Sequence, residues 1–306
     1  MTDLENGIKK SREFLEECKV NGIKIVYQFP TYFMQNIEVW CHWFREFGIN
    51  NISMTSDINS VRETDLCVII SHGFEYCKVN KYIAIQTENF TTVTHDPKSY
   101  IFAIKMFRWK DILKKATVIW DYSLSNISLL KKAGYNNVVH IPIMYSDNNK
   151  LFKNCAILMT EFINRQYDII LAANTPRRLK MTNDLKNNKF KCMNLWRTQL
   201  PFFISKTKIF LNLHAYNAVS ALEIHRLLDL RNIPVVIVSE KSSDGELEKI
   251  LDRIVYVEYN DIVVTCEKII QDENLWKKHL DEQGEMWKNF EDIYKCFPKY
   301  LTEIPT

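Results

Sequence analysis

Residues 208–240, KIFLNLHAYNAVSALEIHRLLDLRNIPVVIVSE, decide the predicted fold. An apolar strand is predicted over 208–213, a helix over 221–230 and a second strand over 234–238. Two strands joined through a helix form a βαβ unit, in which the strands run parallel. The stretch therefore predicts an α/β domain built on a parallel sheet.

The same alternation of short apolar runs and amphipathic stretches continues along the whole chain. Further strands are predicted at 23–28, 66–71, 82–86, 117–120, 138–141, 168–172, 190–193 and 254–257, and further helices at 99–115, 123–133, 177–187, 244–251 and 274–297. The pattern pauses at Pro142 and the polar cluster SDNN, residues 146–149, which favours a turn. It predicts two Rossmann-like domains with parallel sheets, over residues 1–145 and 146–306.

Composition excludes several classes of protein. The 306 residues are 46% hydrophobic and 25% charged, which is a globular balance, and the net charge is only +3. No block of like charge indicates a nucleic-acid partner, so none is expected. No apolar run is long enough for a transmembrane segment, and the polar N-terminus does not resemble a signal peptide. The eight scattered cysteines form no CxxC pair, so a zinc site is not expected. Several of them lie in apolar strand-like runs, as free cysteines do, which indicates a reducing compartment and predicts a cytoplasmic protein.

Common catalytic and phosphate-binding motifs are missing. No GxGxxG follows the first strand, and the chain has no P-loop, GxSxG or HExxH. The nearest approach to a DxD metal motif is Asp244-Gly245-Glu246, so no metal site is predicted. A dehydrogenase is disfavoured because the glycine fingerprint is absent.

Two stretches of the second half predict a ligand site. Small residues at 220–221 precede a predicted helix that carries Glu223 and Arg226. A helix N-terminus of this kind can seat a phosphate, while a carboxylate accepts ribose hydroxyls. Arg177 and Arg178 follow the strand at 168–172, where guanidinium groups can fork onto phosphate oxygens. The alternatives are a surface i,i+3 ion pair for Glu223 and two solvated arginines.

Three further residues are weaker candidates. Glu88 and Asp121 each follow a predicted strand of the first half, where a carboxylate can act as a general base or merely cap a helix or carry a loop charge. Trp196 can stack on a nucleobase, although the sequence favours a position in the core.

Taken together, four blocks resemble a family of GT-B glycosyltransferases found in large DNA viruses (chlorovirus-like) and some bacteria. The blocks are YIAIQTEN at 82–89, VIWDYSLSNISLL at 118–130, YDIILAANTPRR at 167–178 and the stretch at 208–240. The resemblance implies two Rossmann-like domains facing a central cleft, with the acceptor on the N-terminal domain and a nucleotide-diphosphate sugar on the C-terminal domain. It also implies that no cofactor or metal ion is needed, because basic side chains neutralise the leaving diphosphate.

The resemblance assigns roles to particular residues. Arg177 and Arg178 match the basic pair, and Glu223 matches the carboxylate that binds the ribose. The residues that match the pyrophosphate and sugar edge are His214, Tyr216, Ser220, Ala221 and Leu222. A retaining relative often has Glu at the position of Tyr216, so the stereochemical outcome stays open, and Glu88 and Asp121 are the candidate bases of an inverting enzyme.

The predicted function is transfer of a sugar from a nucleotide-diphosphate donor to a hydroxyl group of an oligosaccharide or glycoprotein glycan. Two alternatives stay open at this point. One is a nucleotide-sugar epimerase on the same fold, and the other is a degenerate transferase that only binds a carbohydrate, nucleotide or partner. The base of the donor, whether uracil or guanine, is not determined, and the expected place of action is the host cytoplasm if the protein is viral.

Overall fold

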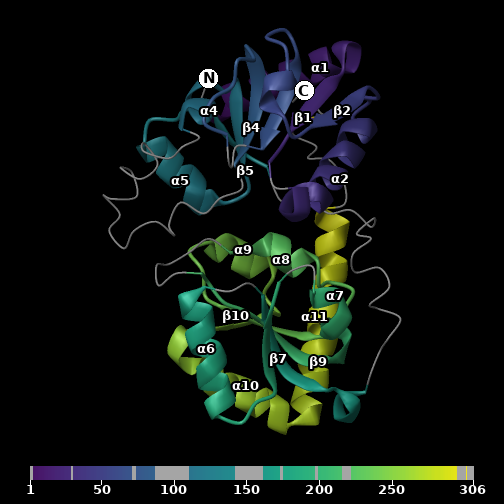
Figure 1. Ribbon diagram of the computed structural model, residues 1–306, viewed down its shortest axis with the longest axis vertical. Helices are drawn as coiled ribbons and strands as arrows, with labels where there is room; N and C mark the ends of the chain where they lie inside the picture. Colours follow the sequence, from purple (N-terminus) through teal and green to yellow (C-terminus); the bar gives the residue numbers. More distant parts are fainter. Residues whose placement is uncertain are drawn as a thin grey trace. The chain divides into compact units, whose positions relative to one another are not determined.

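The computed structural model describes residues 3–28, 30–70, 74–86, 110–141, 161–172, 175–196, 199–215, 222–294 and 301. The chain divides into two compact units (Figure 1). The first unit comprises Met1–Ser146 together with Tyr294–Thr306, and the second comprises Asp147–Ile293. Each unit holds one parallel sheet with helices packed against it.

The first unit is built on a six-stranded parallel sheet with the strand order β2-β1-β3-β4-β5-β6. The strands are β1 (Ile23–Val26), β2 (Ile52–Thr55), β3 (Leu66–Ile70), β4 (Lys81–Gln86), β5 (Val118–Asp121) and β6 (Val138–His140). The central strand β3 is buried along its whole length, as expected for a parallel strand covered on both faces.

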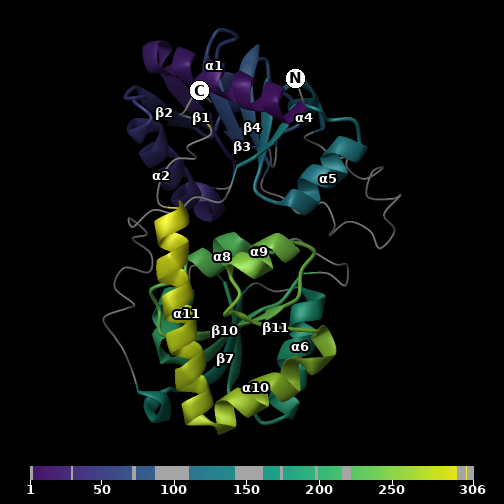
Figure 2. The same cartoon turned by 180° about the vertical axis from the view of Figure 1, so that it is seen from behind.

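Helices cover both faces of the first sheet (Figure 2). They are α1 (Asp3–Asn21), α2 (Pro30–Glu46), α4 (Lys110–Lys115) and α5 (Leu124–Lys132), and a short 3-10 helix, η1 (Ile58–Ser60), follows β2. Phe14 and Leu15 of α1 pack with Trp43 and Phe44 of α2 in one core cluster. The α4 and α5 helices contribute to the other cluster, so the two layers lie on opposite faces.

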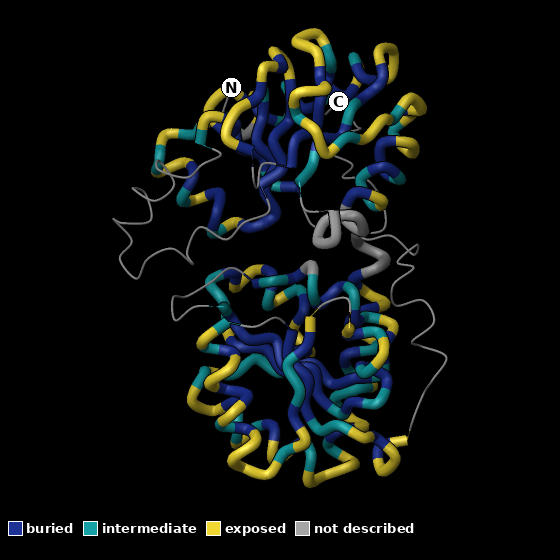
Figure 3. Tube along the Cα trace, in the orientation of Figure 1, coloured by how far each residue is buried: buried dark blue, intermediate teal, exposed yellow. Residues whose placement is uncertain are grey.

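The second unit is built on a five-stranded parallel sheet with the strand order β11-β10-β9-β7-β8. The strands are β7 (Tyr167–Ala172), β8 (Cys192–Leu195), β9 (Thr207–Asn212), β10 (Val236–Glu240) and β11 (Val255–Val257). The inner strands of this sheet are largely buried, and β10 is buried at every position (Figure 3).

The helices of the second unit are α6 (Pro176–Asn187), α7 (Leu200–Phe203), α8 (Ile224–Leu228), α9 (Gly245–Ile250), α10 (Ile262–Gln271) and α11 (Glu273–Tyr294), with 3-10 helices η3 (Phe162–Asn164), η4 (Ile204–Lys206) and η5 (Tyr259–Asp261). Met181 and Leu185 of α6 share a core cluster with Ile262 and Ile269 of α10. The buried amide of Gln283 on α11 bonds to the main chain of Ile237, with its oxygen 2.9 Å from the nitrogen.

The strands predicted from the sequence are all present, with ends shifted by one or two residues. The predictions missed β2, α1, α2, α7 and α10, and the helix predicted over 99–115 is described only as α4 because residues 99–109 lie outside the described part. In the part of the chain that is described, no helix is long and apolar enough to cross a membrane. The expected cytoplasmic location stays a prediction.

The structure differs from the predicted division at the end of the chain. Residues Tyr294–Thr306 belong to the first compact unit, although the sequence assigned all of 146–306 to the second domain. The physical reason is visible at Leu301, which is 1% exposed and packs in the core cluster of the first unit with Phe14 and Trp43.

Candidate functional site

The strand order of the second sheet creates a switch point at β7. The chain passes from β7 to its neighbour β8 on one side, and then crosses to β9 on the other side of β7. The loops that follow β7 and β9 therefore diverge at the carboxyl edge of the sheet. Such a divergence is where doubly wound sheets bind ligands, and both of the stretches that the sequence singled out in this half meet here.

The centre of the site is a buried ion-pair network of Arg178, Glu223 and Arg226. Arg178 is only 3% exposed, and its Nη2 donates to both carboxylate oxygens of Glu223, at 3.0 and 3.1 Å. Its Nε donates to the carbonyl oxygen of Leu213 at 2.8 Å. Arg226 pairs with the same carboxylate and also donates from Nη1 to Oδ1 of Asn212, at 3.1 Å. The two arginines hold Glu223 in one orientation above the end of β9.

The carboxylate of Glu223 is held in its ionised form. Burial raises the pKa of this group, but the charges of Arg226 and Arg178 outweigh that effect and lower the pKa below its ordinary value of 4.5. A carboxylate has about four acceptor positions, and its side chain is 26% exposed, so Glu223 can accept further hydrogen bonds from a ligand. Among the described residues, none accepts a hydrogen bond from Nη1 of Arg178, which leaves that donor for a ligand oxygen.

A second network joins Arg177 to the ends of β9 and β10. Its guanidinium pairs with the carboxylate of Glu240, with Nη1 2.6 Å from Oε2, and donates to the carbonyl oxygen of His214 at 3.2 Å. It also lies over the ring of Tyr259, with Cζ 4.1 Å from the ring centroid. Arg177 is therefore engaged within the protein, and in this geometry it fixes the edge of the site through Glu240 and His214.

Among the described residues, several buried polar atoms without a hydrogen-bond partner lie at the same edge. They include Nδ1 of His214, Oγ of Ser243 and both amide atoms of Asn194. These residues lie at or just beyond the carboxyl ends of β9, β10 and β8, which are three of the five strands. A buried polar group without a hydrogen bond is costly and needs an explanation. A polar ligand at this edge would supply the missing partners.

The protonation of His214 follows from its surroundings. The ring is 1% exposed, and its Nε2 lies 2.9 Å from the carbonyl oxygen of Lys241. A carbonyl only accepts, so Nε2 carries a proton and Nδ1 is the ring atom without a partner among the described residues. The main-chain nitrogen of His214 donates to Glu240 at 3.1 Å, which fixes the turn after β9.

The structure thus brings together Arg177, Arg178, His214, Leu222, Glu223 and Arg226. The backbone nitrogen of Leu222 donates to Oδ2 of Asp244 at 2.9 Å, which anchors the residue that precedes Glu223. Tyr216, Ser220 and Ala221 lie outside the described residues, as does Glu88 of the first half. The site roles that the sequence assigned to all these residues stay predictions.

Two expectations about this site need correction. The helix predicted over 221–230 is only Ile224–Leu228, five residues long, so a helix dipole contributes little and the arginine side chains supply the positive charge. The alternative offered for Glu223 was a surface ion pair with Arg226. The two residues do pair, but the nearly fully buried Arg178 binds the same carboxylate, so the pair is part of a buried network and does not lie on the surface.

Asp121 lies in the first unit, at the carboxyl end of β5, and is 1% exposed. Its Oδ1 accepts a hydrogen bond from the main-chain nitrogen of Ser123 at 2.8 Å, and Ser123 in turn caps α5. This is the capping arrangement that the sequence offered as the alternative to a catalytic base. The role of Asp121 as a base stays a prediction.

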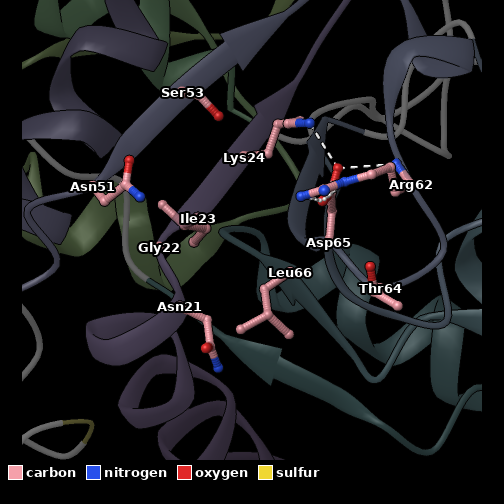
Figure 4. A pocket seen from close by; sticks show the side chains of 10 residues that line it. All are labelled: Asn21, Gly22, Ile23, Lys24, Asn51, Ser53, Arg62, Thr64, Asp65 and Leu66. Carbon is pink, nitrogen blue, oxygen red and sulfur yellow. Dashed lines mark hydrogen bonds and ion pairs between the residues drawn. The ribbon is translucent and has the colours of Figure 1, made fainter.

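A polar cavity of about 440 Å³ lies at the amino ends of β1, β2 and β3 in the first unit (Figure 4). Its floor is an ion-pair relay in which Asp65 accepts from Lys24 at 2.6 Å and from Nε of Arg62 at 3.0 Å. The cavity is on the edge opposite the one at which parallel sheets bind ligands. We interpret the relay as a structural link between β1 and the turn that precedes β3.

Several residues of the site escaped prediction. Glu240 and Asp244 anchor the loops after β9, while Asn212 joins Arg226 to Ser239, whose Oγ is 3.0 Å from Nδ2 of Asn212. The available signal was a polar residue at the end of each apolar strand. Among the described residues, no three His, Cys, Asp or Glu side chains lie close enough to hold a metal ion.

No family model matches the sequence. A protein of Acanthamoeba polyphaga mimivirus, described as uncharacterized, is 30% identical over 190 residues, which is 58% of this chain. The chain spans 63% of the length of that relative. A large DNA virus thus carries a protein similar to this chain.

Two solved structures have a similar fold. One is an alpha-glucosyltransferase in complex with UDP and a 13-mer DNA containing an HMU base, with a TM-score of 0.50 and 10% identity, covering 92% of this chain and 99% of that one. The other is BGT of phage T4 in complex with its UDP-glucose substrate, with a TM-score of 0.54 and 12% identity, covering 92% of this chain and 97% of that one.

The DNA in the first of these structures corrects one expectation from the sequence. The low net charge and the lack of charged blocks argued against a nucleic-acid partner, and the function predicted with the resemblance had a glycan acceptor. Both expectations were wrong, because a modest net charge does not describe the surface of one site and a protein of similar fold holds DNA. The similarity over almost the whole length, together with the two parallel sheets, confirms the predicted architecture. The chain has the GT-B fold.

Proposed function

We propose that this protein is a glycosyltransferase that moves a sugar from a UDP-sugar to a hydroxyl group on a base of a nucleic acid. The observation that carries the proposal is the network of Arg178, Glu223 and Arg226 at the switch point of the second sheet. The UDP and DNA that accompany the similar folds support the choice of donor and acceptor. The mimivirus relative supports a place among the proteins of large DNA viruses.

In this proposal the donor lies along the carboxyl edge of the second sheet. Glu223 accepts hydrogen bonds from the ribose hydroxyls, since its ionised carboxylate is fixed by two arginines and still partly exposed. Nη1 of Arg178 points its hydrogen atoms at an oxygen of the diphosphate. The cationic side chains neutralise the leaving group, so no metal ion or other cofactor is required.

The proposed chemistry is a substitution at the anomeric carbon of the sugar. The acceptor oxygen forms a bond to that carbon, the bond from the carbon to the diphosphate oxygen breaks, and UDP leaves with the electron pair. The hydroxyl proton passes to a carboxylate, for which Glu88 and Asp121 are the proposed groups if the configuration inverts.

Calorimetric titration with UDP tests the donor site. We expect the wild-type protein to bind UDP, and Arg178→Ala and Glu223→Gln each to weaken binding by about tenfold or more, since each removes a charged hydrogen-bond partner. Arg253→Ala is the matched control, because this arginine of the same unit has a half-exposed side chain at 55% and should leave the affinity unchanged. Equal affinities for all four proteins would place the donor elsewhere.

Transfer itself is tested with UDP-glucose and a 13-mer DNA that contains an HMU base, against the same DNA with thymine. We expect a mass increase of one hexose on the HMU strand alone. Conversion of UDP-glucose without any acceptor would indicate the epimerase. UDP binding without transfer, across a panel of UDP-sugars and both DNAs, would indicate a degenerate binding protein and contradict the proposal.

A further inference from the structure

Trp196 stands out because its surroundings contradict the core position that its sequence favoured. It follows β8 directly and is 47% exposed, although tryptophan is usually well buried. Its backbone is held on both sides by Gln199, which accepts from the nitrogen of Trp196 at 3.0 Å and donates to its carbonyl oxygen at 2.8 Å. An exposed indole on a fixed backbone is a ready stacking surface.

Asn194 supplies a second and independent observation on the same strand. Both atoms of its amide are closed to solvent and have no hydrogen-bond partner in the described part of the chain. Cys192 packs in the core cluster with Met181 and Leu185 of α6, and alternate residues of a strand share a face, so Asn194 faces the same side. An amide pairs with any base edge that presents a donor beside an acceptor, as the N3–H and O4 of uracil do.

The position of β8 relative to the proposed ribose site fits a nucleoside. Glu223 lies above the end of β9, and β7 separates β9 from β8. Neighbouring strands are spaced by about 4.8 Å, so about 10 Å separates the ends of β9 and β8. A ribose on Glu223 places its base over that interval, toward Trp196.

We propose that Trp196 stacks on the nucleobase of the donor and that the amide of Asn194 pairs with the edge of that base. The inference rests on the proposed function and extends it, because it assigns the residues that recognise the base. The amide of Asn194 is closed to solvent, so the groups that cover it move aside as the base enters. Stacking of the base on Trp196 changes the environment of the indole.

Titration of Trp196 variants with UDP tests whether this residue stacks on the base. We expect Trp196→Ala to weaken binding by about 5- to 100-fold and Trp196→Phe to recover most of the loss, because stacking needs an aromatic face. Phe202→Ala is the matched control, since Phe202 on the neighbouring α7 is 71% exposed and has no assigned role. Ribose 5-phosphate, which lacks a base, should bind wild type and Trp196→Ala alike.

Asn194→Ala separates recognition from folding. Removal of an amide that has no partner should leave the melting temperature unchanged or raise it, while UDP affinity falls by about tenfold. Addition of UDP should also change tryptophan fluorescence in the wild type, and Trp196→Phe should remove most of that change while keeping measurable affinity.

Three results would overturn the inference. The first is UDP affinity that falls in Arg178→Ala but stays at the wild-type value in Trp196→Ala and Asn194→Ala, which would leave the proposed function standing. The second is a loss of DNA binding in Trp196→Ala with UDP binding retained, which would assign the indole to the acceptor. The third is a wild-type protein that binds no UDP, which would remove the proposed function as well.

Discussion

At the scale of single residues, the ionised state of Glu223 has a measurable consequence for stability. Its folded pKa is lowered, so it contributes stability above the ordinary carboxylate range, and that contribution is lost as pH falls through the folded pKa, below 4.5. We expect Glu223→Gln to lower the free energy of unfolding by about 2 kcal/mol at pH 7, because Arg178 stays buried without its partner. The difference should shrink in acid.

Urea unfolding of wild type and Glu223→Gln at pH 7 and near pH 3 measures this difference. Glu246→Gln is the control, because the exposed pair of Glu246 and Lys249, with side chains 64% and 74% exposed, should contribute little at either pH. A Glu223→Gln difference that is the same at both pH values would contradict the lowered pKa.

The residue scale also shows where sequence reasoning reached its limit. The clustering of Arg178, Glu223 and Arg226 was predictable, because the carboxyl ends of parallel strands meet at one edge. Their mutual pairing was not, since spacing along the chain does not say which charges face each other. The sequence assigned Trp196 to the core for a different reason. The residue lies just beyond the end of an edge strand, where no periodic pattern shows whether a side chain is exposed.

At the scale of elements, Asp65 joins β1 to the turn before β3. Burial raises the pKa of Asp65, but the main-chain nitrogen of Arg62 and the charges of Lys24 and Arg62 lower it to about 2. Its contribution to stability is therefore complete above the unfolded value of 3.8 and is lost as pH falls through about 2.

We expect Asp65→Asn to lower the free energy of unfolding by about 1 kcal/mol at pH 7, a value reduced for solvent screening around the open cavity. Glu63→Gln, at an exposed position in the same turn, is the matched control. Chemical unfolding at pH 7 and pH 2 measures both. Equal stability of Asp65→Asn and wild type at pH 7 would show that the relay is only a surface contact.

Elements differed in how well the sequence predicted them. The buried strand β3 is a continuous apolar run and β10 begins with one, and such runs can be detected in the sequence. The edge strand β2, Ile52–Thr55, has no buried residue and is only four residues long, so the sequence did not distinguish it from a loop. The short α8 was overestimated because the apolar pattern of residues 221–230 continues past Leu228, where the structure has turns.

At the scale of the whole molecule, the sequence did not show that the chain returns to the first unit after it has formed the second. Alternating strands and helices predicted two sheets with a boundary near residue 146, and the first compact unit of the structure runs from Met1 to Ser146 before the chain enters the second. Periodicity describes local segments only, so it did not show that Tyr294–Thr306 returns to the first unit. The first unit is thus assembled from two separate parts of the chain.

Because of this arrangement, substitution of Leu301 tests whether the C-terminal segment stabilises the first unit. Leu301 is 1% exposed in the core of the first unit, so Leu301→Ala should leave a cavity there and lower the free energy of unfolding by about 2–4 kcal/mol. Val20→Ala, at an 85% exposed position on α1, should change little. Hydrogen exchange should show faster opening of β1 and β3 in Leu301→Ala, while β9 and β10 keep their protection because the second unit has its own core. Equal loss of protection in both sheets would mean that the two units unfold as one, and that the core around Leu301 stabilises the second sheet as much as the first.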